Sequence, residues 1–465
     1  MQVAISPNCG SVQARRELEK RFEERVAVNT HLSRKMVSYQ GNRRVPGFRW
    51  MKYKEGFSQA LVERLLDEFL PHSVLDPFAG VGTTPLIAAG RGLNATGIEI
   101  MPVGVLVGKG IAQAANGVAR EALEKSGGEL LDAVKAKGDV PSEYAFRHVR
   151  ITESAFPQET EAAIARARCF IANVSDPAVS ALLDLACMTI LEDVSYTRKD
   201  GQYLRWDYRS GRNLRSKVDK GSILPFDRAL GVRLFEMLQD IEPLKRNYGG
   251  GYPELITGSS LELLRNLPEA SFDMVITSPP YANRYDYTRT YALELAWLGY
   301  EQDDFLSLRQ SMLSATVENR SKREWLRDIY GSDSKILNKA FYMYDEQGAI
   351  HEALAILRRH IAELGNRHVI RLIEGYFLEM AVIIAELGRV LRPDGVVIMV
   401  NDNVQYHGEE IPVDMILSDF AEQSGFRCEK IWTLPCGKGN SSQQMRRFGR
   451  REIRKCVYQW VKLDD

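Results

Sequence analysis

The chain has 465 residues, and its 61 lysines and arginines are balanced by 61 aspartates and glutamates. Its 45% hydrophobic and 26% charged residues are typical of globular proteins and exclude wholesale disorder. No apolar run approaches the roughly 18 residues of a membrane span, no secretory signal is recognisable, and the six cysteines form no CxxC pair. These features predict a cytoplasmic protein with no membrane partner, zinc cluster or disulfide framework.

The neutral total hides an uneven distribution of charge. Residues 1–54 contain twelve basic residues against four glutamates, residues 198–220 eight against three acidic residues, and residues 437–456 seven against one. Aromatic side chains are interleaved with the charges in the second and third runs. A single run is most simply a solvated charged face. Three of them favour a polyanionic partner, because basic groups contact phosphates and aromatic rings stack on unpaired bases.

The first part of the chain predicts a charged segment followed by a βαβ unit. Residues 1–45 are expected to be a basic helical segment, with a charged helix over 11–38. An amphipathic helix is predicted over 57–70, where Pro71 ends it. Residues 73–100 then contain a short apolar strand, a glycine-rich turn, a helix over 84–90 and a second strand over 95–100. That order predicts a parallel sheet.

A second group of α/β signals begins near residue 254. The predicted strands are Glu254–Thr257, Phe272–Thr277, 396–400, 427–434 and 455–462, the predicted helices are 261–267, 376–391 and 412–424, and a turn is expected at 393–395. We therefore expect one doubly wound α/β domain in two pieces, 46–110 and 250–465. Residues 111–249 and 284–372 are largely helical. Loops this long are not structureless in a compact domain, so both are expected to be functional insertions.

The glycine-rich turn after the first strand carries a chemical signature. Open α/β sheets bind ligands at the carboxyl ends of their strands, and Gly80 and Gly82 allow the backbone to approach a ligand closely. The turn lacks the lysine of a P-loop, which disfavours a nucleoside triphosphate. Glu99 ends the second strand, about 20 residues later, where a carboxylate can accept both hydroxyls of a ribose. Together these residues favour a cofactor that contains a nucleoside.

The segment Ser278-Pro279-Pro280-Tyr281 follows a later predicted strand and is the second informative site. Prolines fix φ and have no N–H, so their carbonyls are free to point at a ligand. The Ser278 hydroxyl and the Pro279 carbonyl can both hydrogen-bond an exocyclic amine, and Tyr281 offers a face on which a planar base can stack. A rigid turn with an exposed tyrosine is the simpler alternative.

With these two motifs the sequence resembles the DNA amino-methyltransferases, which transfer a methyl group from S-adenosylmethionine to an exocyclic nitrogen. DPFAGVGTT at 76–84 is similar to their cofactor motif, and TSPPY at 277–281 to their catalytic motif. Segments 48–66, 257–281 and 391–413 resemble further parts of the family, so the resemblance extends over 46–110 and 250–465. It implies a Rossmann-like class I methyltransferase sheet with helices on both faces, interrupted by the two insertions.

The resemblance implies a role for individual residues. S-adenosylmethionine would be the cofactor, no metal would take part, and Glu99 would hold the ribose. Phe57 and Ser58 would close on the methionine end, and the turn residues lining the cofactor would be Asp76, Phe78, Ala79, Gly80, Gly82 and Thr83. The family commonly has an aspartate between glycine and serine after the third strand, whereas this chain has Gly258-Ser259-Ser260. Ser259 would replace that contact to the adenine amine more weakly.

The resemblance also implies a reaction. Ser278, Pro279, Pro280 and Tyr281 would act on a base flipped out of double-stranded DNA, with Tyr281 as the stacking partner. Direct transfer to an amine needs no cysteine nucleophile, and the chain has no Pro-Cys motif. Serine at the first motif position favours the N4 amine of cytosine, and the N6 amine of adenine is the alternative.

Insertions of this kind house target recognition in the family. The first candidate for that role is 111–249, the second is 284–372, and the basic loop 437–451 would contact the DNA backbone. A cognate restriction endonuclease would be a possible partner in the cell. His407, Asn401 and Asp402 lie near the expected base pocket, where a lone histidine is more often a packing or surface residue and the other two can be loop caps.

Two other functions share some of these features. A transfer RNA methyltransferase acting on a guanine or adenine amine has a similar sheet and a similar Pro-Pro-aromatic motif. Such enzymes usually carry a separate N-terminal RNA-binding domain, and only about 45 residues precede the cofactor half here. A nucleic-acid-binding module with a decayed methyltransferase core is the third hypothesis, and the intact motifs argue against it.

Overall fold

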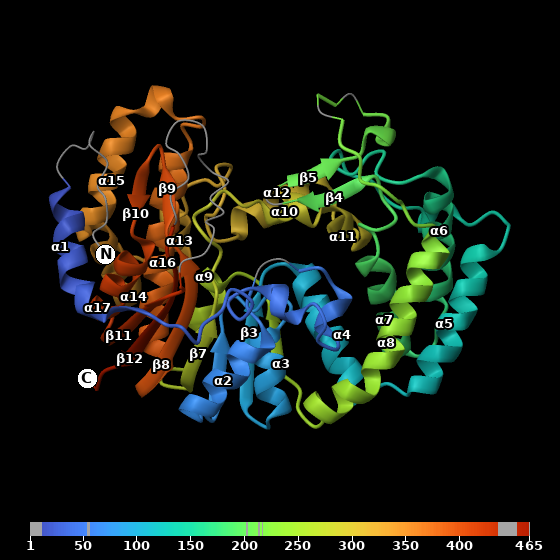
Figure 1. Cartoon of the computed structure of the whole chain (residues 1–465), viewed down its shortest axis with the longest axis horizontal. Coiled ribbons are helices and arrows are strands. Elements are labelled where there is room, and N and C mark those ends of the chain that lie inside the picture. Colours follow the sequence, from blue (N-terminus) through green and yellow to red (C-terminus); the bar gives the residue numbers. More distant parts are fainter. Residues whose placement is uncertain are drawn as a thin grey trace.

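The computed structural model describes residues 12–53, 56–200, 203–212, 214–215, 217–435 and 453–464. Its central element is an eight-stranded mixed sheet with helices on both faces (Figure 1). The strands of this sheet are β1 (Val26–Val28), β2 (Ser73–Asp76), β3 (Asn94–Glu99), β6 (Glu254–Thr257), β7 (Phe272–Thr277), β8 (Leu391–Asp402), β11 (Phe426–Thr433) and β12 (Lys455–Lys462). The Rossmann-like α/β fold expected from the sequence is therefore confirmed.

The strand order is β1-β11-β12-β8-β7-β2-β3-β6, and it reverses direction between β2 and β7. β6, β3, β2, β7 and β8 pair in parallel, whereas β12 is antiparallel to both of its neighbours. In an open sheet, the crevice at such a reversal is the usual ligand site. The reversal therefore brings the end of the first predicted strand beside the start of the Ser-Pro-Pro-Tyr segment.

Two hydrophobic cores cover the two faces of the sheet. Val74 and Ile276 belong to the core of α2 (Gln59–Phe69), α3 (Thr83–Gly90) and α4 (Pro102–Asn116). Leu75 and Val275 belong to the opposite core, which contains α16 (Val369–Val390) and α17 (Val413–Gln423). Burial of both faces explains why the central strands are continuous apolar runs rather than alternating ones.

The first insertion is a separate helical layer, on the right of Figure 1. It contains α5 (Arg120–Lys135), α6 (Gln158–Ala172), α7 (Pro177–Thr189), α8 (Phe226–Tyr248) and a hairpin of β4 (Thr197–Asp200) and β5 (Tyr203–Trp206). α4 packs on β6 as well as on α7 and α8, so it joins this layer to the sheet. The basic aromatic run at 198–220 therefore begins in a hairpin rather than in a helix.

The helices of the second helical stretch pack partly on the first insertion and partly on the sheet. It contains α10 (Tyr287–Thr290), α11 (Ala292–Trp297), α12 (Gln302–Ser311), α13 (Arg323–Tyr330), α14 (Lys335–Glu346) and α15 (Gly348–Arg359). α10 packs against β5 and α11 against α4 and α7, whereas α14 packs against α16 over the sheet. Lys199 of β4 and Glu294 of α11 form a buried ion pair that also links the hairpin to this stretch.

Residues 11–38 do not form the single helix that their charge pattern predicts. α1 (Gln13–Phe22) ends in a 3₁₀ turn, and Val26–Val28 then forms the edge strand β1, parallel to β11. Val26 and Val28 are β-branched and favour a strand, and pairing with Ile431 and Thr433 supplies the hydrogen bonds that a short helix end lacks. The expectation of a wholly helical segment over 1–45 is therefore wrong in this part.

The turn expected at 393–395 is a bulge within β8 rather than a break before it. Phe272 pairs with Leu391 and Met274 pairs with Val396, so the residues between them bulge out of the ladder. Asp394 has a φ of 61°, which fits this local departure from strand geometry. Beyond β8, β9 (Val404–Tyr406) and β10 (Glu409–Ile411) form a second hairpin.

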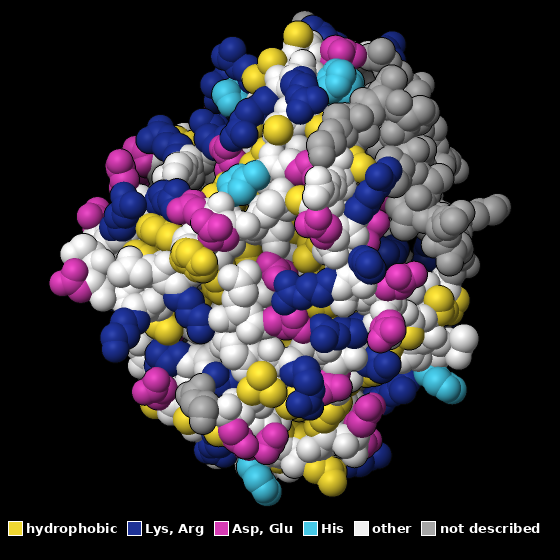
Figure 2. All heavy atoms as spheres, turned by 90° about the vertical axis from the view of Figure 1, so that its left-hand side faces the viewer, with side chains coloured by type: hydrophobic (Ala, Val, Ile, Leu, Met, Phe, Trp, Pro, Cys, Tyr) yellow, Lys and Arg dark blue, Asp and Glu magenta, His cyan; other side chains and the backbone are white. Residues whose placement is uncertain are grey.

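Several basic residues of the N-terminal run form ion pairs with acidic residues of the same chain. Arg21 pairs with Asp419 and Glu422, and Arg25 also pairs with Glu422. On the face that Figure 2 shows, the left-hand side of Figure 1, basic and acidic side chains are interspersed. For these arginines, the simpler explanation of a charged surface therefore needs no polyanionic partner. The basic loop at 437–451 lies outside the described residues. No helix among the described residues is long and apolar enough to cross a membrane.

Candidate active site

A cavity of about 790 Å³, partly open to solvent, lies at the carboxyl ends of β2, β3 and β7. It occupies the place where the strand order reverses. Asp76 from β2, Glu99 from β3 and Ser278 after β7 all line it. The two motifs singled out in the sequence, nearly 200 residues apart, therefore share one cavity.

Asp76 joins the ends of the two central strands. Its Oδ1 accepts hydrogen bonds from the Thr277 hydroxyl at 2.7 Å and from the Phe78 N–H at 3.0 Å. The side chain is buried, and burial raises the pKa of this carboxyl to about 6. Asp76 therefore fixes the start of the glycine-rich turn against the residue that precedes Ser278.

Glu99 holds the turn from the other side. Its Oε2 accepts the Gly80 N–H at 2.6 Å, and its Oε1 accepts the Met101 N–H at 2.7 Å. Burial raises the pKa of the Glu99 carboxyl to about 7. Each carboxylate oxygen can accept two hydrogen bonds. Both oxygens therefore retain acceptor capacity for hydroxyls of a ligand in the cavity.

The turn between these carboxylates depends on glycine. Gly80 and Gly82 have φ values of 57° and 81°, in a region that residues other than glycine rarely adopt. Gly104, in the first turn of α4, packs directly on the turn: a Cβ atom there would lie 2.4 Å from the Gly80 carbonyl oxygen. The helix can approach the turn this closely only because Gly104 has no side chain.

This contact gives a first prediction. Gly104→Ala should displace α4 or the turn, lowering stability by about 1–3 kcal/mol, the usual cost of overpacking, and weakening binding of the nucleoside cofactor that the sequence predicts. Gly128→Ala is the matched control, because a Cβ there meets nothing within 4 Å in the middle of α5. The control should gain about 0.5–1 kcal/mol from helix propensity. Thermal unfolding and titration calorimetry of both variants measure these changes, and equal behaviour would contradict the packing argument.

The charge of the cavity restricts its ligand. Its described lining includes two carboxylates and no lysine, arginine or histidine. A ligand bearing phosphates would place negative charge beside Asp76 and Glu99, which is unfavourable in a buried site. A ligand with a positive centre would instead stabilise the ionised carboxylates. The cavity therefore suits a cationic nucleoside derivative better than a nucleotide.

Ser278 and Tyr281 are held against each other at the catalytic end. The Ser278 hydroxyl donates to the Val400 carbonyl at 3.1 Å and lies 3.3 Å from the Tyr281 hydroxyl. Burial raises the pKa of Tyr281, so this group is a neutral phenol. Ser278 and Pro280 line the cavity, whereas Pro279 and Tyr281 do not. Ser278 is thus the residue of this motif with a polar side chain that lines the cavity.

The structure brings most of the predicted cofactor residues together. Those that line the cavity are Phe57, Asp76, Phe78, Ala79, Gly80, Thr83, Glu99 and Ser259. Ser58 and Gly82 do not. Gly82 is the left-handed residue immediately before α3, and Ser58 is a buried residue immediately before α2. These two positions shape the backbone beside the cavity rather than its surface.

Ser259 differs from the expected adenine contact. Its hydroxyl donates to the Ser311 carbonyl at 3.0 Å, and the neighbouring Ser260 hydroxyl donates to the Pro77 carbonyl. Ser259 therefore reaches a ligand through its oxygen lone pairs, while its proton is already used. A serine in this arrangement accepts a hydrogen bond from an amine but carries no charge to strengthen it.

Several lining residues were not identified from the sequence. They include Tyr53, Ile100, Met101, Leu261, Tyr287, Met312 and Leu313. Ile100 and Met101 directly follow Glu99, so their place at the end of the second predicted strand could have identified them as lining residues. Met312 and Leu313 follow α12 in the second helical stretch, and nothing in the local sequence connects them with the cofactor motif.

The loop after the catalytic motif is anchored on both sides. Asp286 pairs with Arg289 and with Arg309, each at 3.1 Å. The Tyr406 hydroxyl donates to the Ala282 carbonyl at 2.5 Å, and Asn401 donates to the Tyr376 hydroxyl at 2.8 Å. Asp286 and Asn401 therefore make structural contacts within the protein, and Asn401 lies within β8 rather than in the loop that the simpler interpretation expected.

Comparisons with known proteins agree with this geometry. The chain is 43% identical over 461 residues to the type II methyltransferases M.AvaI of Nostoc sp. (strain PCC 7120 / SAG 25.82 / UTEX 2576) and of Anabaena variabilis, an alignment covering 96% of this chain and 92% of either relative. It is 38% identical over 480 residues to the type II methyltransferase M.BsoBI of Geobacillus stearothermophilus, with the same coverage. No family model matches the chain.

Proposed function

The chain belongs to the type II DNA methyltransferases, which use S-adenosylmethionine as methyl donor, and from this we propose that it methylates the exocyclic N4 amine of cytosine in a specific DNA sequence. The observation that carries the proposal is the shared cavity, in which Asp76 and Glu99 lie together with Ser278. S-adenosylmethionine held by Asp76 and Glu99 would lie next to an amine held by Ser278. Direct transfer between two ligands requires this adjacency.

The proposed cofactor residues fit the chemistry of the donor. Glu99 would accept the two ribose hydroxyls on the lone pairs that its contacts with Gly80 and Met101 leave available. Phe57 would cover the methionine end, and Ser259 would accept from the adenine amine. S-adenosylmethionine supplies a methyl group that is already activated by a sulfonium charge, and the two buried carboxylates favour a positive centre in the cavity.

The proposed catalytic residues act on the amine. The lone pair of the cytosine N4 amine is delocalised into the ring, so the amine is a poor nucleophile. Hydrogen bonds to the Ser278 oxygen and the Pro279 carbonyl would favour a pyramidal nitrogen and stabilise the positive charge that develops on it. The Val400 carbonyl orients the Ser278 proton away from the amine, so that the serine oxygen is presented as an acceptor.

A base inside a duplex cannot reach this cavity, so we propose that the target cytosine is flipped out of the helix. Tyr281 is the proposed stacking partner. Its hydroxyl lies against Ser278, which fixes one edge of the ring. Two prolines precede it and restrict the backbone, so the ring is presented in a defined orientation.

The first insertion, 111–249, is the proposed target-recognition region. Its hairpin places the exposed Arg198 and Arg205 at directly opposite positions on β4 and β5. Both guanidinium groups are on the exposed side of the hairpin, where basic side chains can contact phosphates. Arg212 lies over the Trp206 ring at 3.7 Å, which adds a flat cationic surface nearby. Residues 284–372 are the second candidate region, and a cognate restriction endonuclease is the proposed partner in the cell.

A labelled-methyl transfer assay tests the proposed function. The protein, labelled S-adenosylmethionine and either unmethylated bacterial DNA or total transfer RNA are incubated, and label in each nucleic acid is counted. We expect label in DNA and none in RNA. Label in RNA alone would establish a transfer RNA methyltransferase. Retained DNA binding without label in either substrate would establish a binding module with an inactive core.

A further inference from the structure

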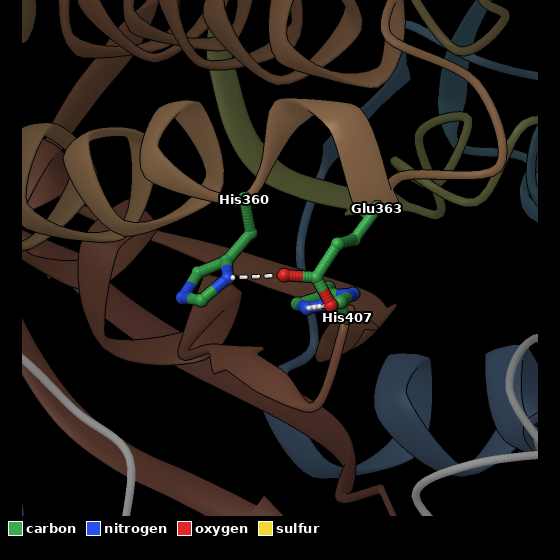
Figure 3. A group of neighbouring side chains, drawn as sticks. All are labelled: His360, Glu363 and His407. Carbon is green, nitrogen blue, oxygen red and sulfur yellow. Dashed lines mark hydrogen bonds and ion pairs between the residues drawn. The ribbon is translucent and has the colours of Figure 1, made fainter.

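Two histidines and a glutamate converge at the tip of the β9–β10 hairpin, outside the cavity. His407 lies in the turn of this hairpin, His360 directly follows α15, and Glu363 ends the 3₁₀ turn Ile361–Glu363. One potential metal-binding atom from each side chain lies within 4.8 Å of the others. Figure 3 shows the three side chains pointing toward one another from these two segments.

The backbone at His407 lies in the left-handed region. His407 and Gly408 have φ values of 51° and 81°, as in the two-residue turns that usually contain asparagine and glycine. Residues other than glycine are uncommon in this region, and histidine is among the few types enriched there. In this turn it directs its ring to Glu363, with 3.7 Å between His407 Nε2 and Glu363 Oε2, while His360 Nδ1 lies 3.1 Å from Glu363 Oε1.

We propose that His360, Glu363 and His407 bind one zinc ion, or another divalent transition-metal ion of similar preference. Imidazole nitrogens and a carboxylate oxygen are the donors that zinc takes in proteins, and a water molecule would complete four-coordination. Donors around tetrahedral zinc lie about 3.4 Å apart. The donors lie within 4.8 Å of one another, so binding would require rotation of the His360 and Glu363 side chains, which are 36% and 42% exposed.

The site would hold the hairpin against the end of α15. Tyr406, the residue before His407, donates its hydroxyl to the Ala282 carbonyl, one residue after Tyr281. The Arg284 guanidinium lies 6.0 Å from the centre of the Tyr406 ring. A metal ion at the hairpin tip would therefore stabilise the position of the segment that supports the catalytic motif. Its role would be structural, because none of the three ligands lines the cavity.

Zinc binding by the full chain tests the proposal without measuring methylation, so its outcome is distinct from that of the proposed function. The protein is stripped with a chelator, dialysed and titrated with zinc, with metal content measured by mass spectrometry. We expect one zinc per chain and a rise in the thermal unfolding midpoint, because a ligand that binds the folded state stabilises it. His407→Asn should weaken binding at least tenfold while preserving the turn, since asparagine tolerates the left-handed conformation.

His148→Ala is the matched control. His148 also pairs with a glutamate, at 2.7 Å from Glu161, but no second histidine completes a group there among the described residues. This variant should bind zinc as the unmodified protein does. The proposal would be overturned by the absence of stoichiometric zinc, or by binding that His407→Asn and His360→Ala leave unchanged.

Discussion

Ser278→Ala is expected to lower the rate of methyl transfer about 100-fold to 1,000-fold, the usual loss when one preorganised polar contact to a developing charge is removed. Ser278 lines the cavity, and its oxygen is the proposed acceptor for the target amine. S-adenosylmethionine affinity should stay within about twofold, because the carboxylates that define the cofactor end are unchanged. Single-turnover methyl transfer and titration calorimetry separate the two effects.

Ser271→Ala is the matched control for this variant. Ser271 immediately precedes β7, whereas Ser278 immediately follows it, and its hydroxyl donates to the Pro268 carbonyl away from the cavity. Both substitutions remove one hydroxyl and its hydrogen bond to a carbonyl, at about 1 kcal/mol, and Ser278→Ala also removes the contact with the Tyr281 hydroxyl. An unchanged transfer rate in Ser278→Ala, or an equal loss in Ser271→Ala, would contradict the role assigned to Ser278.

Glu99→Gln is expected to weaken S-adenosylmethionine binding about 10-fold to 100-fold. Hydrogen bonds to a charged acceptor contribute about 1.5–3 kcal/mol, and the neutral amide forms weaker ones. Glutamine also places an amide nitrogen where the carboxylate now accepts the Gly80 or Met101 N–H. Titration calorimetry measures the loss. Retained affinity would exclude Glu99 as the ribose contact.

The pH dependence of S-adenosylmethionine binding tests independently whether Glu99 contacts the ribose. Glu99 has a pKa near 7 in the free protein, raised by burial. A cofactor whose hydroxyls donate to the ionised carboxylate, and whose sulfonium is positive, binds that form preferentially. Affinity should therefore rise about tenfold between pH 6 and pH 8, with release of a proton. Glu99→Gln should remove most of this dependence.

The stability of the cofactor-free protein should change in the opposite sense. The folded state holds the protons of Asp76 and Glu99 to higher pH than the unfolded chain does, because their pKa values are raised to about 6 and about 7. The contribution of these protonated groups is complete below their unfolded pKa values and is lost as the pH rises through the folded ones. Thermal unfolding across pH 5 to pH 8 measures this loss, which Glu99→Gln should reduce.

The sequence was sufficient to predict the α/β class of the sheet and most of its strands. The apolar strands, the glycine-rich turn and the proline segment are local patterns, and the resemblance to a family connected the motifs of Asp76 and Ser278, which line one cavity. These predictions succeeded because each depends on a short stretch of chain and on the general topology of parallel sheets.

Other features depended on contacts between distant segments. Val26–Val28 forms a strand only because β11 lies beside it, and its charged neighbours resembled a helix. The arginines of the same run found carboxylates on α17, which no local pattern could reveal. Met312 and Leu313 reach the cavity from the second helical stretch. His360 likewise lies near His407 although the two are 47 residues apart in the sequence.

The identity of the methylated nucleoside tests the central claim most directly. DNA modified by the protein with S-adenosylmethionine is digested completely to nucleosides and resolved by mass spectrometry against standards. We predict that N4-methyldeoxycytidine accumulates with the unmodified protein and falls by at least 100-fold in initial rate with Ser278→Ala. N6-methyldeoxyadenosine or 5-methyldeoxycytidine in its place would contradict the proposed acceptor.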